Sequence, residues 1–278
     1  MTRATGSAEG NRVLDIQRLF VAGAQGDERA QQEFEGLFRD AHKNVYLPSF
    51  TSDEREREPT IRKYLKWAAQ DELNGTEEFG PGRLQYVVST RDGRAAGMSY
   101  QNVIPGDNFS IAYLNYFAVR PDLRGAGEGR RLARGAVRLA AGQAKEIGKP
   151  LGYVVAELDK PTPADAGAGG FYQTSFGMGA PVMDGAELAP YWYPEVYGQE
   201  AVPLVFGIAP VDGSREMSPD DYVGLTGMVL DDYASDPDVY SAEQIGQIRE
   251  NIRKGVEGKR IQIAPFETTI KLQYPAFS

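Results

Sequence analysis

Glycines and arginines gather in the middle of the chain, between residues 119 and 132. This stretch reads V-R-P-D-L-R-G-A-G-E-G-R-R-L, with glycines at 125, 127 and 129 and arginines at 124, 130 and 131. Glycines allow backbone N–H groups to approach a ligand closely, because no Cβ is in the way. Arginines beside them supply positive charge and rigid hydrogen-bond donors. The stretch therefore has the composition of an anion site, and a pyrophosphate is the ligand that fits it best.

The flanking residues predict the elements that would position this anion site. Before it, Ile111 to Val119 is rich in β-branched and aromatic residues, and the run stops at Pro121. After it, apolar and small residues at helical spacing predict a helix over 129–148 that ends before Pro150. Backbone N–H groups at a helix N-terminus attract anions, and the helix dipole adds to this attraction. The sequence thus predicts a strand, a glycine turn and a helix N-terminus in direct succession.

The spacing V-x-P-x-x-R-G-x-G-x-G-x-x-L, from Val119 to Leu132, resembles the cofactor motif of the GNAT acyl-CoA N-acyltransferases. No G-x-x-x-x-G-K-[S/T] string occurs, and the third glycine comes one residue early for a dinucleotide fingerprint. The resemblance implies that the loop holds the pyrophosphate of acetyl-CoA and that the preceding strand pairs with the pantetheine arm. The alternative is a glycine-rich turn that binds no ligand. The implied cofactor-binding residues are Phe117, Ala118, Val119, Arg124, Gly125, Ala126, Gly127, Glu128, Gly129 and Arg130.

Glu128 departs from the family pattern, which usually has an apolar residue at this position. A carboxylate fits beside a pyrophosphate only when it points away from it.

The order of the elements predicts the fold class. Three strands, over 84–89, 95–104 and 111–119, precede the glycine loop and are joined by turns at Asp92-Gly93 and at Pro105-Gly106. Leu151 to Leu158 is a further strand, and the resemblance places it parallel to the cofactor strand, with the two splaying apart. We expect an α+β fold of GNAT type, with a mixed, mostly antiparallel sheet that contains this splayed parallel pair and is flanked by helices.

Further helices are predicted at both ends of the chain. Two short helices are expected between Asn11 and Phe38, and an amphipathic helix over 60–73. At the other end, helices over 219–234 and 241–254 precede a closing strand near 260–264. We predict an acyltransferase core over 1–212, which includes the N-terminal helices, and a C-terminal helical extension over 213–278 that packs on the core.

The resemblance also implies the chemistry. In this family an amine attacks the thioester carbonyl directly, so a chain without cysteine can carry out the reaction. Glu157, near the end of its strand, is the candidate general base, and Asp159, Glu54 and Glu195 are further candidates. Tyr172, in the segment G-F-Y-Q-T-S-F-G-M, is the candidate acid for the departing thiolate. It stands five residues before Gly177, where the family spacing is four.

Two aromatic segments are candidates for binding the acceptor. The Ser-Phe-x-x-x-Glu-Arg pattern resembles the acceptor-facing segment of the family and selects Phe50 and Glu54, although a solvated charge run explains it equally well. The segment Y-W-Y-P-E-V-Y contributes Tyr191 and Trp192, whose rings suit an apolar acceptor or a cation. The alternative for this second segment is a patch that docks another subunit or the C-terminal segment.

Composition excludes several classes of site. The 278 residues include no cysteine and one histidine, so thiolate sites and multi-histidine metal sites are excluded, and we expect no metal. A net charge of −9 makes nucleic acid a poor partner. Without a signal peptide or a long apolar run, we expect a cytoplasmic protein that does not bind membranes.

The activity expected from these residues is an acetyl-CoA-dependent N-acetyltransferase acting on a small-molecule amine. One alternative is a GNAT-fold protein that binds acyl-CoA without transfer. Another is a transferase whose donor is a longer acyl-CoA or an acyl carrier protein. The identity of the amine and pairing with a second copy of the chain are left open.

Overall fold

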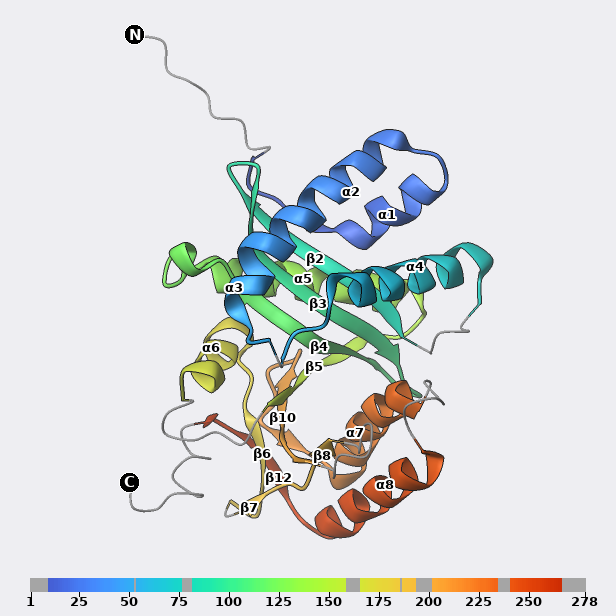
Figure 1. Ribbon diagram of the computed structural model, residues 1–278. Helices are drawn as coiled ribbons and strands as arrows, with labels where there is room; N and C mark the ends of the chain where they lie inside the picture. Colours follow the sequence, from blue (N-terminus) through green and yellow to red (C-terminus); the bar gives the residue numbers. More distant parts are fainter. Residues whose placement is uncertain are drawn as a thin grey trace. The chain divides into compact units, whose positions relative to one another are not determined.

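The chain divides into two compact units (Figure 1). The computed structural model describes residues 10–52, 54–76, 82–158, 166–185, 187–193, 202–234 and 241–266. Unit 1 comprises residues 1–76, 84–101 and 116–139, and unit 2 comprises residues 77–83, 102–115 and 140–278. The predicted boundary between residues 212 and 213 falls inside unit 2 and stays a prediction.

The elements follow one another closely along the described chain. The first half contains β1 (Val13–Asp15), α1 (Ile16–Ala24), α2 (Glu28–Ala41), η2 (His42–Tyr46), α3 (Leu47–Ser49), α4 (Glu58–Asn74), β2 (Arg83–Arg91), β3 (Arg94–Pro105), β4 (Ser110–Val119), η3 (Pro121–Leu123) and α5 (Glu128–Glu146). The second half contains β5 (Leu151–Leu158), α6 (Ala166–Phe176), β6 (Ala180–Met183), β7 (Glu187–Leu188), β8 (Trp192–Tyr193), β9 (Val202–Pro203), β10 (Val205–Pro210), β11 (Glu216–Met217), α7 (Pro219–Ala234), α8 (Ala242–Val256) and β12 (Ile261–Ala264).

The main sheet has the strand order β1-β2-β3-β4-β5-β10. Strands β1 and β2 pair antiparallel, as do β5 and β10, whereas β4 and β5 pair parallel. The parallel register ends at Leu114↔Ala156, although β4 continues to Val119 and β5 to Leu158. Helix α5 connects the two parallel strands, which antiparallel neighbours would not require. The expected fold class, a mixed sheet with one parallel pair and flanking helices, is confirmed.

Unit 1 builds its core between helices and the strands of its part of the sheet. In α2, Phe34, Leu37, Phe38 and Ala41 recur at helical spacing and are buried. They pack with side chains of α1, α4, β2 and β3 in one apolar cluster. Figure 1 shows α1, α2 and α4 on one side of β2 and β3, with α5 behind these strands.

Strand β1 was not expected from the sequence, which predicted only helices in this region. Val13, Leu14 and Asp15 pair with β2 before α1 begins. Asp15 ends the strand and caps the helix, since its Oδ1 accepts a hydrogen bond from the Gln17 N–H at 3.1 Å. Three residues are too few to give a periodic pattern, so only the pairing partner reveals the strand.

Unit 2 has its own apolar cluster and a second sheet. That sheet has the order β11-β12-β6-β7. The predicted C-terminal helices are present as α7 and α8, and the closing strand as β12. One face of α8 packs into the apolar cluster. Its buried residues recur at helical spacing: Ile245, Ile248, Ile252 and Val256. Full burial of each such side chain contributes roughly 1.5–3 kcal/mol.

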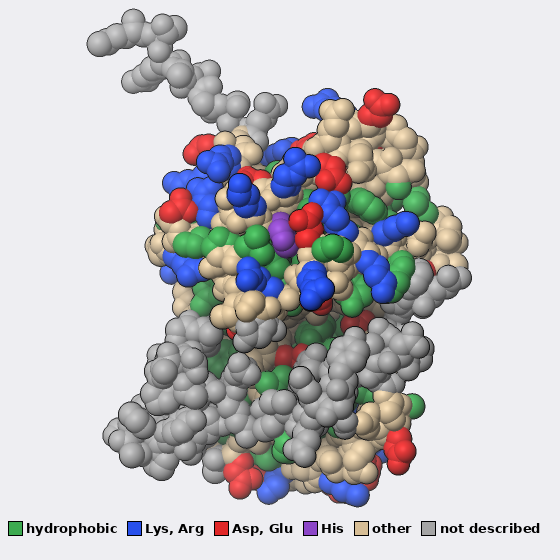
Figure 2. Space-filling model, in the orientation of Figure 1, with side chains coloured by type: hydrophobic (Ala, Val, Ile, Leu, Met, Phe, Trp, Pro, Cys, Tyr) green, Lys and Arg blue, Asp and Glu red, His purple; other side chains and the backbone are tan. Residues whose placement is uncertain are grey.

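Charge is distributed unevenly between the units. Unit 1 contains 19 Arg and Lys residues against 16 Asp and Glu residues, whereas unit 2 contains 11 against 23. Figure 2 shows Lys and Arg side chains gathered around the purple side chain of the chain's one histidine, His42, which belongs to unit 1. The acidic net charge therefore comes from unit 2, and unit 1 is the part suited to anionic ligands. None of the described helices has the length and apolar content that crossing a membrane would require.

Candidate functional site

The glycine loop lies in unit 1, between the end of β4 and the start of α5, as the sequence predicts. Gly125 has φ of 78° and Gly127 has φ of 81°, in the left-handed region that L side chains rarely adopt. The loop closes on itself through a hydrogen bond from the Ala126 N–H to the Leu123 carbonyl, at 3.3 Å. First-turn N–H groups of a helix have no intrahelical acceptor, so those of α5 remain available to an anion.

A cavity of about 730 Å³ adjoins this loop, and four of its ten lining residues are arginines. Its walls are formed by Asn11, Val13, Gly125, Gly127, Arg130, Arg131, Arg134, Gly135, Arg138 and Leu139. Arg130, Arg134 and Arg138 follow one another at four-residue spacing on the exposed side of α5. No ion pair joins any of these three to another residue in the described part of the chain. The cavity thus offers guanidinium groups and a helix N-terminus to the same ligand.

Glu128 does not oppose this positive field. Its side chain is buried, with 5% exposure. The carboxylate accepts hydrogen bonds from Ser89 Oγ at 2.7 Å and from Arg131 Nη2 at 2.6 Å. Arg131 in turn donates to the Thr90 carbonyl at 2.7 Å. Glu128 therefore points away from the ligand side of the loop, as a carboxylate beside a pyrophosphate must. Its charge is directed into the protein and is neutralised there by Arg131.

The strand residues that precede the loop are held in place on several sides. Phe117, Ala118 and Val119 are each less than 5% exposed. Arg124 Nε donates to the Val119 carbonyl at 3.3 Å, and Arg124 Nη2 lies 3.2 Å from Ser49 Oγ. Arg124 therefore ties the end of β4 to α3.

In unit 2, three tyrosine hydroxyls surround the carboxylate of Glu157. Tyr113 Oη donates to Oε2 over 2.5 Å, and Tyr191 Oη donates to Oε1 over 2.5 Å. Tyr233 Oη donates to Oε2 as well, and it lies 2.7 Å from Tyr113 Oη. Tyr113 is 4% exposed and Tyr191 is 2% exposed, so two of the three donors are closed to water. The predicted base Glu157 and the predicted acceptor residue Tyr191 are brought together, while Tyr113 and Tyr233 were not singled out from the sequence.

Burial raises the pKa of Glu157 above its usual range, and the three tyrosine hydrogen bonds lower it in part. Burial and the charge of Glu157 raise the pKa of Tyr191 well above its usual range, so this tyrosine stays a donor. A carboxylate with a raised pKa can accept a proton at neutral pH and still release it. Glu157 therefore stays a candidate for proton transfer.

Tyr172 lies on α6, near its C-terminal end, with its ring 5.8 Å from that of Phe171 and 6.3 Å from that of Phe176. Burial raises the pKa of Tyr172 to about 12, so the hydroxyl keeps its proton at neutral pH. The helix ends at Gly177, whose N–H donates to the Gln173 carbonyl at 2.8 Å and whose φ is 74°. Tyr172 thus lies next to Gln173, the residue whose carbonyl accepts the hydrogen bond that caps the helix.

The predicted acceptor residue Phe50 belongs to an aromatic group in unit 1. Its ring lies 5.3 Å from that of Tyr46 and 5.1 Å from that of Tyr116, a residue of β4. The predicted acid Glu54 is exposed, and its Oε2 accepts two hydrogen bonds from Thr51, each of 2.7 Å. The carboxylate of Glu54 is therefore hydrogen-bonded within a local turn.

Glu56, two residues further, is the acid that sequence reasoning missed. Its Oε2 is buried and has no hydrogen-bond partner among the described residues. Its backbone N–H donates to Tyr46 Oη at 2.8 Å, and burial raises the pKa of its carboxyl group. Glu58 is engaged elsewhere, with Arg62 Nε at 2.8 Å. Only packing distinguishes the three acids of the E-R-E-R-E run, and the run itself carries no signal that could have found Glu56.

Of the remaining predicted acids and acceptor residues, only Trp192 lies in the described part of the chain. Trp192 is 37% exposed, so its ring is available to a ligand. Asp159 and Glu195 lie outside the described residues. In the part of the chain that the structure describes, no group of His, Cys, Asp or Glu side chains could hold a metal ion.

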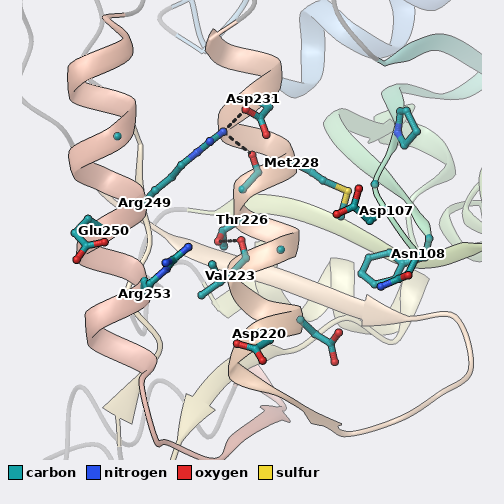
Figure 3. A pocket seen from close by; sticks show the side chains of 17 residues that line it. Asp107, Asn108, Asp220, Val223, Thr226, Met228, Asp231, Arg249, Glu250 and Arg253 are labelled. Atoms are coloured by element: carbon teal, nitrogen blue, oxygen red, sulfur yellow. Dashed lines mark hydrogen bonds and ion pairs between the residues drawn. The ribbon is translucent and has the colours of Figure 1, made fainter.

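A second cavity of about 730 Å³ lies in unit 2, between α7, α8 and the turn before β4 (Figure 3). Charged side chains of both signs line it, among them Asp107, Asp220, Glu250 and Arg253. Arg249 of α8 reaches across to Asp231 of α7 and also donates to the Gly227 carbonyl at 3.3 Å. Sequence reasoning did not point to this cavity, because its residues come from three separate segments.

Several solved structures of acetyltransferases are similar to this chain. An acetyltransferase candidate of the GNAT family from Bacteroides thetaiotaomicron is 17% identical, with 77% of this chain and 93% of that chain covered and a TM-score of 0.43. An acetyltransferase candidate from Salmonella typhimurium, solved with its cofactor acetyl-CoA, is 16% identical over 73% and 95% of the chains, with a TM-score of 0.38. The ribosomal-protein-S18-alanine N-acetyltransferase from Escherichia coli is 16% identical over 72% and 94%, with a TM-score of 0.34.

Neither protein-family models nor curated protein sequences match this chain. The expected similarity to GNAT acetyltransferases is thus present among solved structures. At these identities and TM-scores, it leaves the activity to be inferred from the chain's own residues.

Proposed function

We propose that this chain is a coenzyme A thioester-dependent N-acyltransferase that transfers an acetyl group from acetyl-CoA to the amine of a small molecule. The observation that carries the proposal is the glycine loop at the N-terminus of α5, with Gly125 and Gly127 in the left-handed region beside Arg130, Arg134 and Arg138. A helix N-terminus beside guanidinium groups that have no ion-pair partner among the described residues suits a ligand that carries several phosphates.

The end of β4 supports a role for the pantetheine arm. The parallel pairing with β5 extends to Leu114, and β4 continues to Val119. By its resemblance to the GNAT pattern, we assign this last part of β4 to the pantetheine arm, whose two amides would form hydrogen bonds along the strand backbone.

The reaction proceeds by direct attack. Glu157 first accepts a proton from the acceptor's ammonium group and leaves a neutral amine. The amine nitrogen then forms a bond to the thioester carbonyl carbon, the C–S bond breaks, and Tyr172 donates a proton to the departing thiolate. The nitrogen loses its second proton to solvent, and Tyr172 regains a proton from solvent. Backbone N–H groups at the end of β4 would stabilise the oxyanion, and each such donor lowers the barrier by about 3–4 kcal/mol in comparable sites.

The acceptor is a small amine with an apolar portion. Phe50 and Tyr116 are partly exposed, and Trp192 is more so, which offers ring faces to an apolar body or to a cation. A longer acyl donor remains an alternative to acetyl-CoA, and the cytoplasm remains the proposed location.

Titration calorimetry with acetyl-CoA tests the cofactor assignment. The wild-type chain should bind acetyl-CoA, and Arg130→Gln should weaken binding about tenfold or more, because a charge-assisted hydrogen bond contributes about 1.5–3 kcal/mol. Arg29→Gln is the matched control, since Arg29 is an exposed arginine on α2 that does not line the cavity. Absence of heat with the wild-type chain would overturn the proposal.

Release of free CoA tests transfer. Acetyl-CoA is incubated with the chain and a panel of primary amines, and the free thiol is followed with a chromogenic disulfide. Transfer predicts amine-dependent thiol release. Tight binding of acetyl-CoA without release for any amine would favour the alternative, a protein that binds acyl-CoA without transferring it.

A further inference from the structure

Helix α7 of the C-terminal segment reaches the carboxylate of Glu157. Tyr233, next to the last residue of α7, donates its hydroxyl proton to Glu157 Oε2. Tyr113 of β4 donates to the same oxygen, and the two hydroxyl oxygens are 2.7 Å apart. Tyr191 serves the other oxygen, Oε1. The carboxylate thus depends on donors from three segments that are far apart in the sequence.

The three tyrosine hydrogen bonds offset part of the cost of burying the ionised form of Glu157. In that form, both oxygens accept hydrogen bonds and all three phenols can donate. When Oε2 is protonated, its own O–H must find an acceptor between two phenols that would otherwise donate to it. Each donor therefore stabilises the charge against the cost of burial. Tyr113 and Tyr191 are buried, whereas Tyr233 is partly exposed.

The end of α7 that carries Tyr233 is fixed by neighbouring contacts within unit 2. Asn102 Nδ2 donates to Asp232 Oδ2 at 3.1 Å, which ties the adjacent residue to β3. The ion pair between Arg249 and Asp231 holds α8 against the same turn of α7 (Figure 3). Met228, one turn earlier, packs so closely on the turn before β4 that a Cβ on Gly106 would lie 2.6 Å from its Sδ. The position of Tyr233 is thus set by tertiary contacts on several sides.

Other titratable groups also affect this cluster. Asp232 lies beside Tyr233 in the sequence, and burial, with a smaller contribution from the charge of Glu157, raises its pKa to about 6. Burial raises the pKa of Tyr222, on the same helix, and its hydroxyl donates to the Pro190 carbonyl at 3.1 Å instead of to Glu157. Tyr222 therefore offers a comparison: it is a tyrosine of α7 whose hydroxyl is bonded but does not contact the carboxylate.

We propose that Tyr233 is a positioning residue for Glu157, and that the C-terminal helix α7 is for this reason an integral part of the reaction site. The hydroxyl of Tyr233 orients the Glu157 carboxylate through Oε2 and stabilises its ionised form. This inference rests on the proposed function in one respect only, the role of Glu157 as the base. The hydrogen bond itself and its effect on protonation are independent of transfer.

Carbon-13 NMR of the glutamate carboxyl groups in the full chain tests the inference directly. The midpoint for protonation of Glu157, assigned with Glu157→Gln, is compared in the wild type, Tyr233→Phe and Tyr222→Phe. Tyr233→Phe should raise the midpoint by about one pH unit or more, as expected for the loss of one hydrogen bond to a charge. Tyr222→Phe should leave it in place. Equal midpoints in wild type and Tyr233→Phe would overturn the proposal.

A second variant covers the case in which Tyr233→Phe fails to fold. Incorporation of 3-fluorotyrosine at position 233 keeps the shape of the ring and makes the phenol a stronger donor, so the Glu157 midpoint should fall. An unchanged midpoint there would also contradict the proposal.

Turnover separates this inference from the proposed function. With an amine that releases CoA, Tyr233→Phe should move the acidic limb of the kcat profile to higher pH while the affinity for acetyl-CoA stays unchanged. If no amine releases CoA, the proposed function fails, and the NMR midpoints still decide the role of Tyr233. If CoA is released and the acidic limb of Tyr233→Phe coincides with that of the wild type, the inference fails and the proposed function stands.

Discussion

Glu128 and Arg131 form an ion pair at the start of α5, with Arg131 Nη2 2.6 Å from Glu128 Oε1. The acid is 5% exposed at its side chain and the arginine 33%, so the pair is shielded on one side only. Arg131 extends the contact to the backbone of β2 and of the residue before β1, through the Thr90 carbonyl at 2.7 Å and the Arg12 carbonyl at 3.3 Å. The pair therefore anchors the first turn of the helix to β2 and to the residue before β1, just beside the glycine loop.

Glu128→Gln should destabilise the chain by about 1–3 kcal/mol, because it removes a buried charge partner and weakens the bonds to Ser89 and Arg131. Chemical denaturation measures the free energy of unfolding. Glu33→Gln is the control, since it breaks the exposed Arg12–Glu33 pair and should cost less than about 1 kcal/mol. Similar losses in both variants would contradict the anchoring role of Glu128.

Gly127→Ala and Gly142→Ala should change stability in opposite directions. A Cβ on either residue would have no atom within 4 Å, so neither substitution causes a clash. Gly127 has a left-handed backbone, and alanine there should cost about 1–2 kcal/mol. Gly142 lies inside α5, where alanine should add up to about 1 kcal/mol. Denaturant unfolding of both variants checks the signs, and a stabilising Gly127→Ala would show that the loop is not held in this conformation.

Glu56→Gln should stabilise the chain increasingly as pH rises. Burial raises the pKa of Glu56 in the folded state, so the stability contributed by its neutral form is present below the unfolded pKa and lost as pH rises through the folded pKa. Glutamine has no charge to bury at any pH. Thermal unfolding between about pH 4 and pH 8 measures the difference from wild type. A flat difference for Glu56→Gln would show that its carboxylate is paired in solution.

Tyr172→Phe should slow turnover if its hydroxyl protonates the thiolate, and it should leave acetyl-CoA affinity unchanged. With the pKa of Tyr172 raised to about 12, the phenol is protonated across the working range, and the loss should be independent of pH below that value. A general acid contributes about 100-fold to 10,000-fold in rate. Tyr191→Phe serves as a comparison, because it removes a donor from Glu157 and should shift the pH profile instead. Full activity of Tyr172→Phe would remove this residue from the mechanism.

The sequence by itself determined the features that are local in the chain. The strand before the loop, the glycine turn and the helix after it lie within about forty consecutive residues, and their patterns predicted β4, the loop and α5 close to their observed bounds. The sequence predicted helices α7 and α8 for the same reason, because the periodicity and the N-terminal residues that indicate each helix lie within the helix or directly before it. Such features need no information about distant partners.

Only the tertiary structure decided which side chains meet. The donors to Glu157 stand 44, 34 and 76 residues away along the chain, and no spacing rule connects them. Glu54, Glu56 and Glu58 look equivalent in the sequence, but their surroundings differ. Thr51 donates to the carboxylate of Glu54, and Arg62 pairs with Glu58. Packing beside Tyr46 buries Oε2 of Glu56, which has no hydrogen-bond partner among the described residues. Burial and hydrogen bonding set the protonation of an acid, and both arise from residues brought together by folding rather than from its neighbours in sequence.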